Sequence, residues 1–185
     1  LHRSIEIAPL FETNIVRLFS FWKIENITEE HWKRIFDKLE LPIRIAERED
    51  IVLGFENVSS GNIGTSEDLQ KLFDHFDSPN LKLIWDPGNA YAAGDFSPNP
   101  TGYHRVKDRV VHVHVKDIDF IDGTRAWLPV GTGKIDYKSE LQALNDDEYD
   151  GAIALETHFR FPNDYGVEST RQSYEGLMQI LKEIS

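Results

Sequence analysis

Several apolar runs of this sequence end in an ionisable residue. Glu56, Asp86 and Glu156 close the runs IVLGFE, LKLIWD and AIALE, and the run VVHVHVKD carries two histidines two residues apart. Side chains alternate along a strand, so we expect His112 and His114 on the same face of one strand. Carboxylates and imidazoles bind divalent cations and also transfer protons. The sequence therefore offers groups for metal-assisted or acid–base chemistry.

The arrangement of these runs predicts that their ends meet. Each run is apolar until its last residue, and stretches of helical spacing separate the runs. Strands that are apolar on both faces and alternate with helices are typical of a parallel sheet covered by helices. The carboxyl ends of such strands are neighbours, and an α/β barrel places its active site there. We expect the side chains of Glu56, Asp86 and Glu156 to share one space with a histidine of the run at 110–117.

Local patterns predict the elements that carry these runs. Proline, glycine and asparagine mark the turns, and apolar spacing marks the helices. The predicted strands lie at 14–22, 51–56, 81–86 and 110–117, and a fifth ends at Glu156. The predicted helices lie at 1–13, with Leu1, Ile5 and Ala8 on one face and a disturbance at Pro9, at 28–49, kinked or divided at Pro42, after an N-cap at Ser66, briefly at 103–108, from Asp136 to about Asn145, and at 167–184, where Tyr174, Leu177, Met178 and Leu181 face the sheet. A loop is predicted over 87–102 and a long irregular connection over 118–133.

The number of strands limits the architecture. Five strands alternate with helices in 185 residues, and no linker divides them. A closed (β/α)8 barrel needs eight strands and typically ~250 residues. We therefore expect a single α/β domain over 1–185, a partial barrel of the TIM type with about five parallel strands, flanking helices and its N-terminal portion missing. The alternative is a smaller open sheet, whose edge at 14–22 would invite pairing with another chain, so a homo-oligomer is possible.

Composition excludes some classes of function. Thirty-two acidic and twenty basic residues give a net charge of -12, which opposes binding to nucleic acid and to anionic membranes. The chain has no cysteine, so no thiolate can serve as a metal ligand. No apolar run approaches the ~20 residues that span a bilayer. We expect a cytoplasmic protein that binds neither nucleic acid nor a membrane.

Six short segments together resemble one known family. They are FEN at 55–57, WDPGN at 85–89, HVHVKD at 112–117, GTGKIDY at 131–137, YDG at 149–151 and LETH at 155–158. In order and spacing they are similar to the last five strands of the xylose isomerase-like TIM barrel superfamily of sugar and sugar-phosphate isomerases and epimerases. The resemblance implies one divalent ion, manganese, magnesium, cobalt or zinc, held by Glu56, Asp86, His114 and Glu156. It also implies that Glu56 and Glu156 carry protons.

The activity that this resemblance implies is proton transfer next to a carbonyl. A metal-dependent isomerase or epimerase would act on a small sugar or sugar phosphate through a metal-stabilised enolate. A dehydratase of a cyclic polyol ketone, similar to inosose dehydratase, would use the same enolate. An abasic-site endonuclease of the same fold would require more histidine ligands than this chain supplies. A non-catalytic truncated remnant is a further alternative.

Four more residues are candidates for contact with substrate. Lys116 shares the parity of the histidines and could meet a hydroxyl or phosphate, unless it is a solvated lysine. His158 shares the parity of Glu156, and the alternative for it is a surface histidine. Asn89 lies three residues after Asp86 and could contact substrate or support a ligand. Trp22 could line the substrate pocket, or it could only pack against neighbouring side chains.

The remaining candidates have structural alternatives. His112 is expected to be a hydrogen-bonded residue one layer below His114. Arg125 is a guess for the arginine that related epimerases use to hold substrate oxygens. Glu56 and Asp86 could cap the helices that follow them instead of binding metal. The GTG turn before Lys134 could bind phosphate, although a tight turn that leads into the helix at Asp136 explains it as well.

Overall fold

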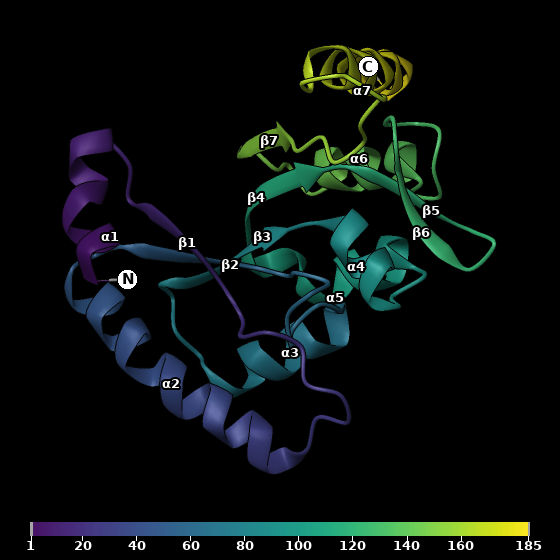
Figure 1. Ribbon diagram of the computed structural model, residues 1–185. Coiled ribbons are helices and arrows are strands. Elements are labelled where there is room, and N and C mark those ends of the chain that lie inside the picture. The colour runs from purple at the N-terminus through teal and green to yellow at the C-terminus, as the bar shows by residue number, and fades with distance from the viewer. Residues whose placement is uncertain (1, 185) are drawn as a thin grey trace.

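A parallel five-stranded sheet forms the centre of the molecule. The computed structural model describes residues 2–184, and Figure 1 shows the sheet curving from its first strand to its last. The strand order is β1-β2-β3-β4-β7, with every neighbouring pair parallel. The bounds are β1 (Ile15–Phe19), β2 (Val52–Glu56), β3 (Leu81–Trp85), β4 (Val110–Val115) and β7 (Ala152–Leu155). The sheet is a half-barrel with flanking helices, which confirms the predicted partial barrel.

Helices connect these strands and flank the sheet. In Figure 1, α2 and α3 lie below the first strands, while α6 and α7 lie beyond β4 and β7. The bounds are α1 (His2–Ile7), α2 (Glu29–Arg48), α3 (Ser66–His75), α4 (Pro87–Ala93), α5 (Tyr103–Val106), α6 (Tyr137–Asp146) and α7 (Val167–Ile184), with short helical turns at Ala8–Phe11, Pro98–Gly102 and Lys107–Arg109. In the described part of the chain no helix is both long enough and apolar enough to cross a membrane.

The alternation of side chains along the strands separates the core from the site. Leu53 and Phe55 on β2 are fully buried, and so are Val113 and Val115 on β4. The residues that alternate with these point to the opposite face of the sheet. They are Glu56 on β2, His112 and His114 on β4, and Lys116 directly after β4. The strands therefore use one face for apolar packing and aim the ionisable groups of the other face at one place.

Helix α2 shows how well the helical spacing predicted the core. Thr28 caps it, because its side chain accepts a hydrogen bond from the backbone of His31, and Trp32, Ile35 and Leu39 are buried. Pro42 lies inside one continuous helix. The predicted division at this proline is therefore wrong.

The segment after β3 was predicted as a loop and is partly helical. Asp86 accepts a hydrogen bond from the backbone nitrogen of Asn89 at 2.8 Å, and Pro87 occupies the first turn of α4. A capping carboxylate followed by proline is a good helix start. The many Pro, Gly and Asn residues of 87–102 concealed that start.

The connection after β4 is a hairpin where the prediction was an irregular loop. Strands β5 (Asp117–Ile121) and β6 (Thr124–Leu128) pair antiparallel across Asp122 and Gly123, both of which have positive φ. A two-residue Asp-Gly loop of this kind fits the twist of a β-hairpin. The alternating residues around Asp122-Gly123 were the signal for it.

Smaller predictions at the helix ends also need correction. Thr65, not Ser66, is the N-cap of α3, and it accepts a hydrogen bond from the backbone of Asp68. Leu177 of α7 is buried as predicted, whereas Tyr174 is 53% exposed and faces away from the core. The strand predicted over 14–22 ends at Phe19, after which Trp22 forms one isolated antiparallel bridge with Gly61. Leu1 lies outside the described residues.

A buried carboxyl group beneath the site gives a testable pH dependence. Glu140 of α6 is fully buried, accepts a hydrogen bond from Trp85 Nε1 at 2.5 Å, and has a second oxygen without a protein partner. Burial raises the pKa of Glu140 to about 8. Between the ordinary glutamate pKa of 4.5 and this value the folded state keeps a proton that the unfolded state releases. Its stability should therefore fall as pH rises through that window, by up to about 1.4 kcal/mol per pH unit.

The variant Glu140→Gln tests this dependence. Its amide copies the neutral acid, so the difference in unfolding free energy between pH 6 and pH 9 should be smaller than in the wild type. Urea unfolding at both pH values measures the difference, with the exposed Glu25→Gln as control. An unchanged pH dependence in Glu140→Gln would show that Glu140 is ionised in the folded protein.

Candidate metal centre

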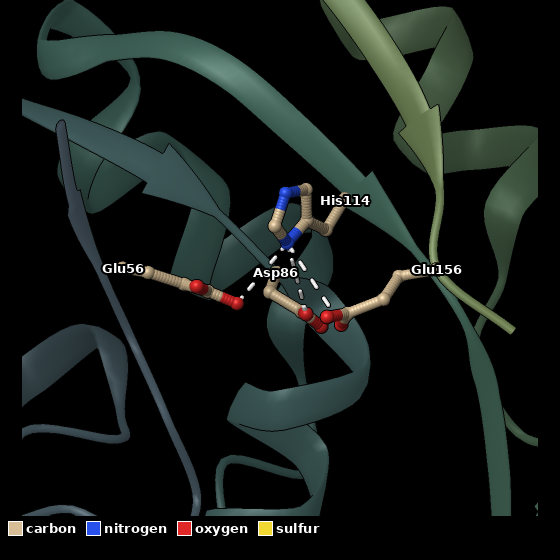
Figure 2. A group of neighbouring side chains, drawn as sticks. All are labelled: Glu56, Asp86, His114 and Glu156. Atoms are coloured by element: carbon tan, nitrogen blue, oxygen red, sulfur yellow. Dashed lines mark hydrogen bonds and ion pairs between the residues drawn. The ribbon is translucent and has the colours of Figure 1, made fainter. Parts of the chain in front are cut away.

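Four side chains from four different strand ends meet in one small volume. Figure 2 shows Glu56 and Glu156 entering from opposite sides of the His114 ring, with Asp86 between them. The nitrogen His114 Nδ1 lies 3.1 Å from Glu56 Oε1, 3.9 Å from Asp86 Oδ2 and 3.9 Å from Glu156 Oε2. The structure thus brings together all four of the residues that the sequence singled out as ligands.

Asp86 divides its two oxygens between structure and site. Oδ1 caps α4 through the backbone of Asn89, while Oδ2 faces His114 and the other carboxylates. The capping alternative raised from the sequence is therefore correct for one oxygen of Asp86, and it does not compete with a metal-binding role for the other. Because the cap holds the carboxylate at the start of a helix, the direction of Oδ2 is restricted.

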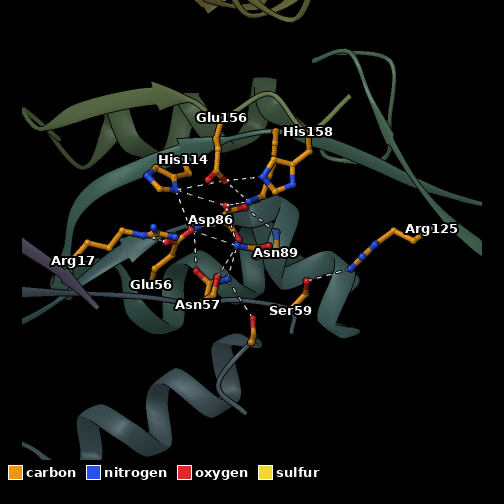
Figure 3. Close-up of polar contacts among 12 residues, drawn as sticks. Arg17, Glu56, Asn57, Ser59, Asp86, Asn89, His114, Arg125, Glu156 and His158 are labelled. Atoms are coloured by element: carbon orange, nitrogen blue, oxygen red, sulfur yellow. Dashed lines mark hydrogen bonds and ion pairs between the residues drawn. The ribbon is translucent and has the colours of Figure 1, made fainter. Parts of the chain in front are cut away.

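Glu56 is held by two side chains on opposite sides. His114 bonds to Oε1, and Arg17 Nε of β1 donates a hydrogen bond to Oε2 (Figure 3). Burial on its own raises the pKa of Glu56, but the hydrogen bonds from His114 and Arg17 outweigh it, so the pKa of this carboxyl lies below its usual value. Glu56 is therefore an ionised carboxylate at neutral pH.

His114 responds in the opposite direction. Burial lowers the pKa of the imidazole, and the hydrogen bond with Glu56 and the nearby charges of Asp86 and Glu156 raise it above its usual value overall. An imidazole flanked by three carboxylates occupies an environment of negative potential. A divalent cation is stabilised by the same environment.

Asn89 contacts two of the carboxylates, and Asn57 holds the backbone of Asp86. Asn89 Nδ2 donates to Asn57 O at 2.8 Å, to Asp86 Oδ2 at 3.1 Å and to Glu56 Oε1 at 3.5 Å. Asn57 exchanges two hydrogen bonds with the backbone of Asp86, both 2.9 Å long. Asn89 is buried and its side-chain nitrogen is engaged with the carboxylates and with Asn57, so its contacts favour the supporting role over a direct substrate contact.

His158 and Trp127 stand on the other side of the centre. His158 Nε2 lies 3.5 Å from Glu156 Oε2, and its hydrogen bond to Glu156, together with that of Lys116, lowers the pKa of this carboxyl well below its usual range. The rings of Trp127 and His158 pack edge to face with their centroids 4.9 Å apart. Trp127 therefore forms a wall beside His158.

The remaining candidates lie farther from the four ligands. Trp22 is 80% exposed and lines a cleft of about 420 Å³ together with Arg17 and Phe19 at the β1 edge. Arg125 reaches from β6 to Ser59 at 3.4 Å, as Figure 3 shows, and packs over the ring of Trp127. His112 packs edge to face against His114 and is outside the ligand group.

Sequence reasoning missed three residues of this site. Arg17 is a single charge inside an otherwise apolar strand, which was an available signal for a site residue. Asn57 directly follows Glu56 but belongs to no ligand pattern. Trp127 was hidden in a connection that was predicted to be irregular, although the Asp-Gly pair at 122–123 was an available signal for a hairpin.

The donor set fits one divalent ion. One ligand atom from each of the four residues can be chosen so that all lie within 4.8 Å of one another. Two ligands on opposite sides of an ion at ~2.1 Å are ~4.2 Å apart, so a small contraction would close the site. Three carboxylates and one imidazole suit magnesium, manganese, cobalt or zinc.

The fold and this cluster define the class of protein. The family model described as xylose isomerase-like TIM barrel matches residues 1–183. The chain belongs to this family, which confirms the resemblance drawn from the six segments.

Curated relatives of the chain include inosose dehydratases. The enzyme of Clostridium perfringens is 26% identical over 145 residues, which are 70% of this chain and 48% of that protein. The enzyme of Salmonella typhimurium is 25% identical over 176 residues, which are 85% of this chain and 56% of that protein. The chain thus spans about half the length of these relatives.

Solved structures give the same family. A D-tagatose 3-epimerase-like protein is 25% identical with a TM-score of 0.76, covering 97% of this chain and 66% of that one. Two others share the fold at lower identity. The IOLI protein with a bound zinc atom has a TM-score of 0.79 at 18% identity, covering 98% and 67% of the two chains. A xylose isomerase-like protein of Mycobacterium smegmatis in complex with magnesium has a TM-score of 0.71 at 19% identity, covering 100% and 66%.

Proposed function

We propose that this site moves a proton at the carbon next to the carbonyl of a ketose sugar or sugar phosphate, and so isomerises or epimerises it. The observation that carries the proposal is the placement of two carboxylates, Glu56 and Glu156, on opposite sides of one candidate metal centre (Figure 2). A base on one face of a planar intermediate and an acid on the other can invert a carbon, or return the proton to its neighbour.

Glu56, Asp86, His114 and Glu156 would hold the divalent ion. When bound, the ion supplies a Lewis acid that stabilises negative charge on the carbonyl and hydroxyl oxygens of the substrate. Asn89 keeps two of the carboxylates aimed at the ion through its hydrogen bonds to Asp86 and Glu56.

Glu56 and Glu156 would carry the protons. Both carboxyl groups have a lowered pKa, so both are bases in the resting protein. One of them takes the proton from the carbon next to the carbonyl. Return on the opposite face needs a protonated group, and the ammonium of Lys116, which lies on the Glu156 side of the centre, is a proton source there. His158 lies on the same side.

Three residues are proposed to contact the sugar. Lys116 and His158 present donors beside Glu156, and Trp22 offers an exposed aromatic face at the opposite edge of the site. Asn89 would act on the sugar only through the ligands that it holds. Trp127, between Lys116 and His158, would exclude water from the reacting carbon.

A dehydratase of a cyclic polyol ketone is the second candidate. Its first step is the same proton removal, and loss of a hydroxyl from the next carbon replaces the return of the proton. The similarity to inosose dehydratases favours it. A chain that binds metal without turnover is the third candidate, favoured by the open half-barrel, in which β1 and β7 have no further partner strand among the described residues.

A substrate panel in heavy water separates these candidates. The metal-loaded protein is incubated with ketoses, their phosphates and inososes, and products are followed by NMR. An epimerase or isomerase puts deuterium next to the carbonyl and changes the sugar, whereas a dehydratase forms an unsaturated ketone that absorbs in the ultraviolet. If the protein binds metal but gives neither of these two signals, the catalytic proposal is contradicted. Size-exclusion chromatography of the same sample tests the predicted homo-oligomer.

A further inference from the structure

Lys116 occupies an unusual position beside the four proposed ligands. It follows β4 directly, shares the parity of His114, and its side chain is only 3% exposed. Its ammonium nitrogen lies 2.8 Å from Asp86 Oδ2 and also contacts Glu156 Oε2. A lysine buried to this degree keeps its charge only where anions surround it.

Lys116 contacts the same carboxylate oxygens that are proposed to bind the metal ion. Asp86 Oδ2 and Glu156 Oε2 are the same atoms that lie 3.9 Å from His114 Nδ1. One ammonium therefore neutralises two of the three carboxylates at the positions from which they would bind an ion. Glu56, the third carboxylate, is neutralised by Arg17.

We propose that Lys116 is a built-in counter-ion of the metal-free centre, which a divalent ion displaces from Asp86 and Glu156 as it binds. The inference rests on the metal centre of the proposed function and adds that lysine and metal compete for the same oxygens. It assigns Lys116 two positions, one on the carboxylates and one turned away from them toward Trp127.

Electrostatics drives this exchange. Without a cation, the fully buried Asp86 and its neighbours Glu56 and Glu156 would repel one another in a medium of low dielectric. With a divalent ion in place, an ammonium on the same oxygens would be repelled by the ion. Each cation therefore stabilises the cluster and disfavours the other.

Trp127 offers the displaced ammonium a second environment. The centroid of its ring lies 5.5 Å from Lys116 Nζ, within reach of a cation–π interaction. The flexible four-carbon stem of lysine allows such a movement without a change in the backbone. His158, whose ring packs on Trp127, would be a neighbour of the ammonium in this position.

The variant Lys116→Met tests the competition in binding and in stability. Methionine keeps most of the apolar stem and removes the charge. Isothermal titration with Mn²⁺ should give a dissociation constant lower than that of the wild type by about tenfold or more, because no cation must be displaced. The chelator-treated variant should melt lower than the chelator-treated wild type by about 5 °C or more, because a buried carboxylate has lost its partner. Lys134→Met, at an exposed lysine 3.8 Å from Asp119, is the matched control and should change neither value.

A second measurement stays valid if Lys116→Met folds poorly. In wild-type protein labelled with ¹⁵N at lysine side chains, Mg²⁺ should shift the Nζ resonance of Lys116 and leave that of Lys134 in place. Two results would overturn the proposed competition between lysine and metal: a Lys116 resonance that does not move while Mg²⁺ binds, or a Lys116→Met variant that binds Mn²⁺ no more tightly than wild type. Either result would leave the proposed metal centre intact. If wild type binds neither ion, the metal centre and the competition fall together.

Discussion

Replacing Glu156 by glutamine is expected to abolish turnover of any ketose that the metal-loaded protein accepts, lowering kcat by about 10²–10⁴-fold. Glutamine keeps the size of the side chain and an oxygen that can accept from Lys116 and His158, but it cannot take up a proton. The fold should survive, because Glu156 lies just after β7 at the mouth of the half-barrel and is only partly buried. Steady-state kinetics and the deuterium exchange described above measure the loss.

Two controls make this result specific. Glu168→Gln, at an exposed glutamate of α7 that pairs with Arg171, should leave turnover unchanged. Circular dichroism and thermal melting of Glu156→Gln should match the wild type closely enough to show a folded chain. Wild-type kcat in a folded Glu156→Gln protein would remove this residue from the mechanism.

Replacing Asp86 by asparagine is expected to have the largest effect on metal binding. The variant keeps an oxygen that can cap α4 in place of Oδ1, and it replaces the charged Oδ2 that faces His114 and Lys116. Metal affinity measured by titration should fall by more than the about 10–100-fold that is typical for loss of an outer-shell partner. Secondary structure should be retained.

A second helix cap provides the control for this experiment. Asp136 caps α6 by accepting from the backbone of Ser139, and it is remote from the proposed ligands in sequence and contacts. Asp136→Asn changes a cap of the same kind without touching the centre, so its metal affinity should equal that of the wild type. Equal affinity in Asp86→Asn would contradict the assignment of Asp86 as a ligand.

The sequence predicted that the candidate ligands meet because strand ends obey simple rules. A parallel strand that is apolar until its last residue places that residue at the carboxyl edge of the sheet, next to the ends of its neighbours. The alternation of His112 and His114 further predicted which face they share. Those two regularities located Glu56, Asp86, Glu156 and the histidine pair, and the family resemblance then selected His114, although the residues span a hundred positions of the chain.

The contacts that tune the centre could not be predicted in the same way. Arg17 reaches Glu56 across 39 residues of sequence, and Lys116 reaches Glu156 across 40. Which partner a long side chain selects depends on the register and curvature of the sheet. Helix α4 was missed for a different reason, since Asp86 serves as both cap and candidate ligand, and a loop-like composition follows it.

Anomalous scattering from a crystal of the protein saturated with Mn²⁺ or Zn²⁺ tests the central claim most directly. The account predicts one strong anomalous peak within bonding distance of Glu56, Asp86, His114 and Glu156 together. A metal-saturated crystal whose anomalous peaks all lie away from these four side chains would contradict it.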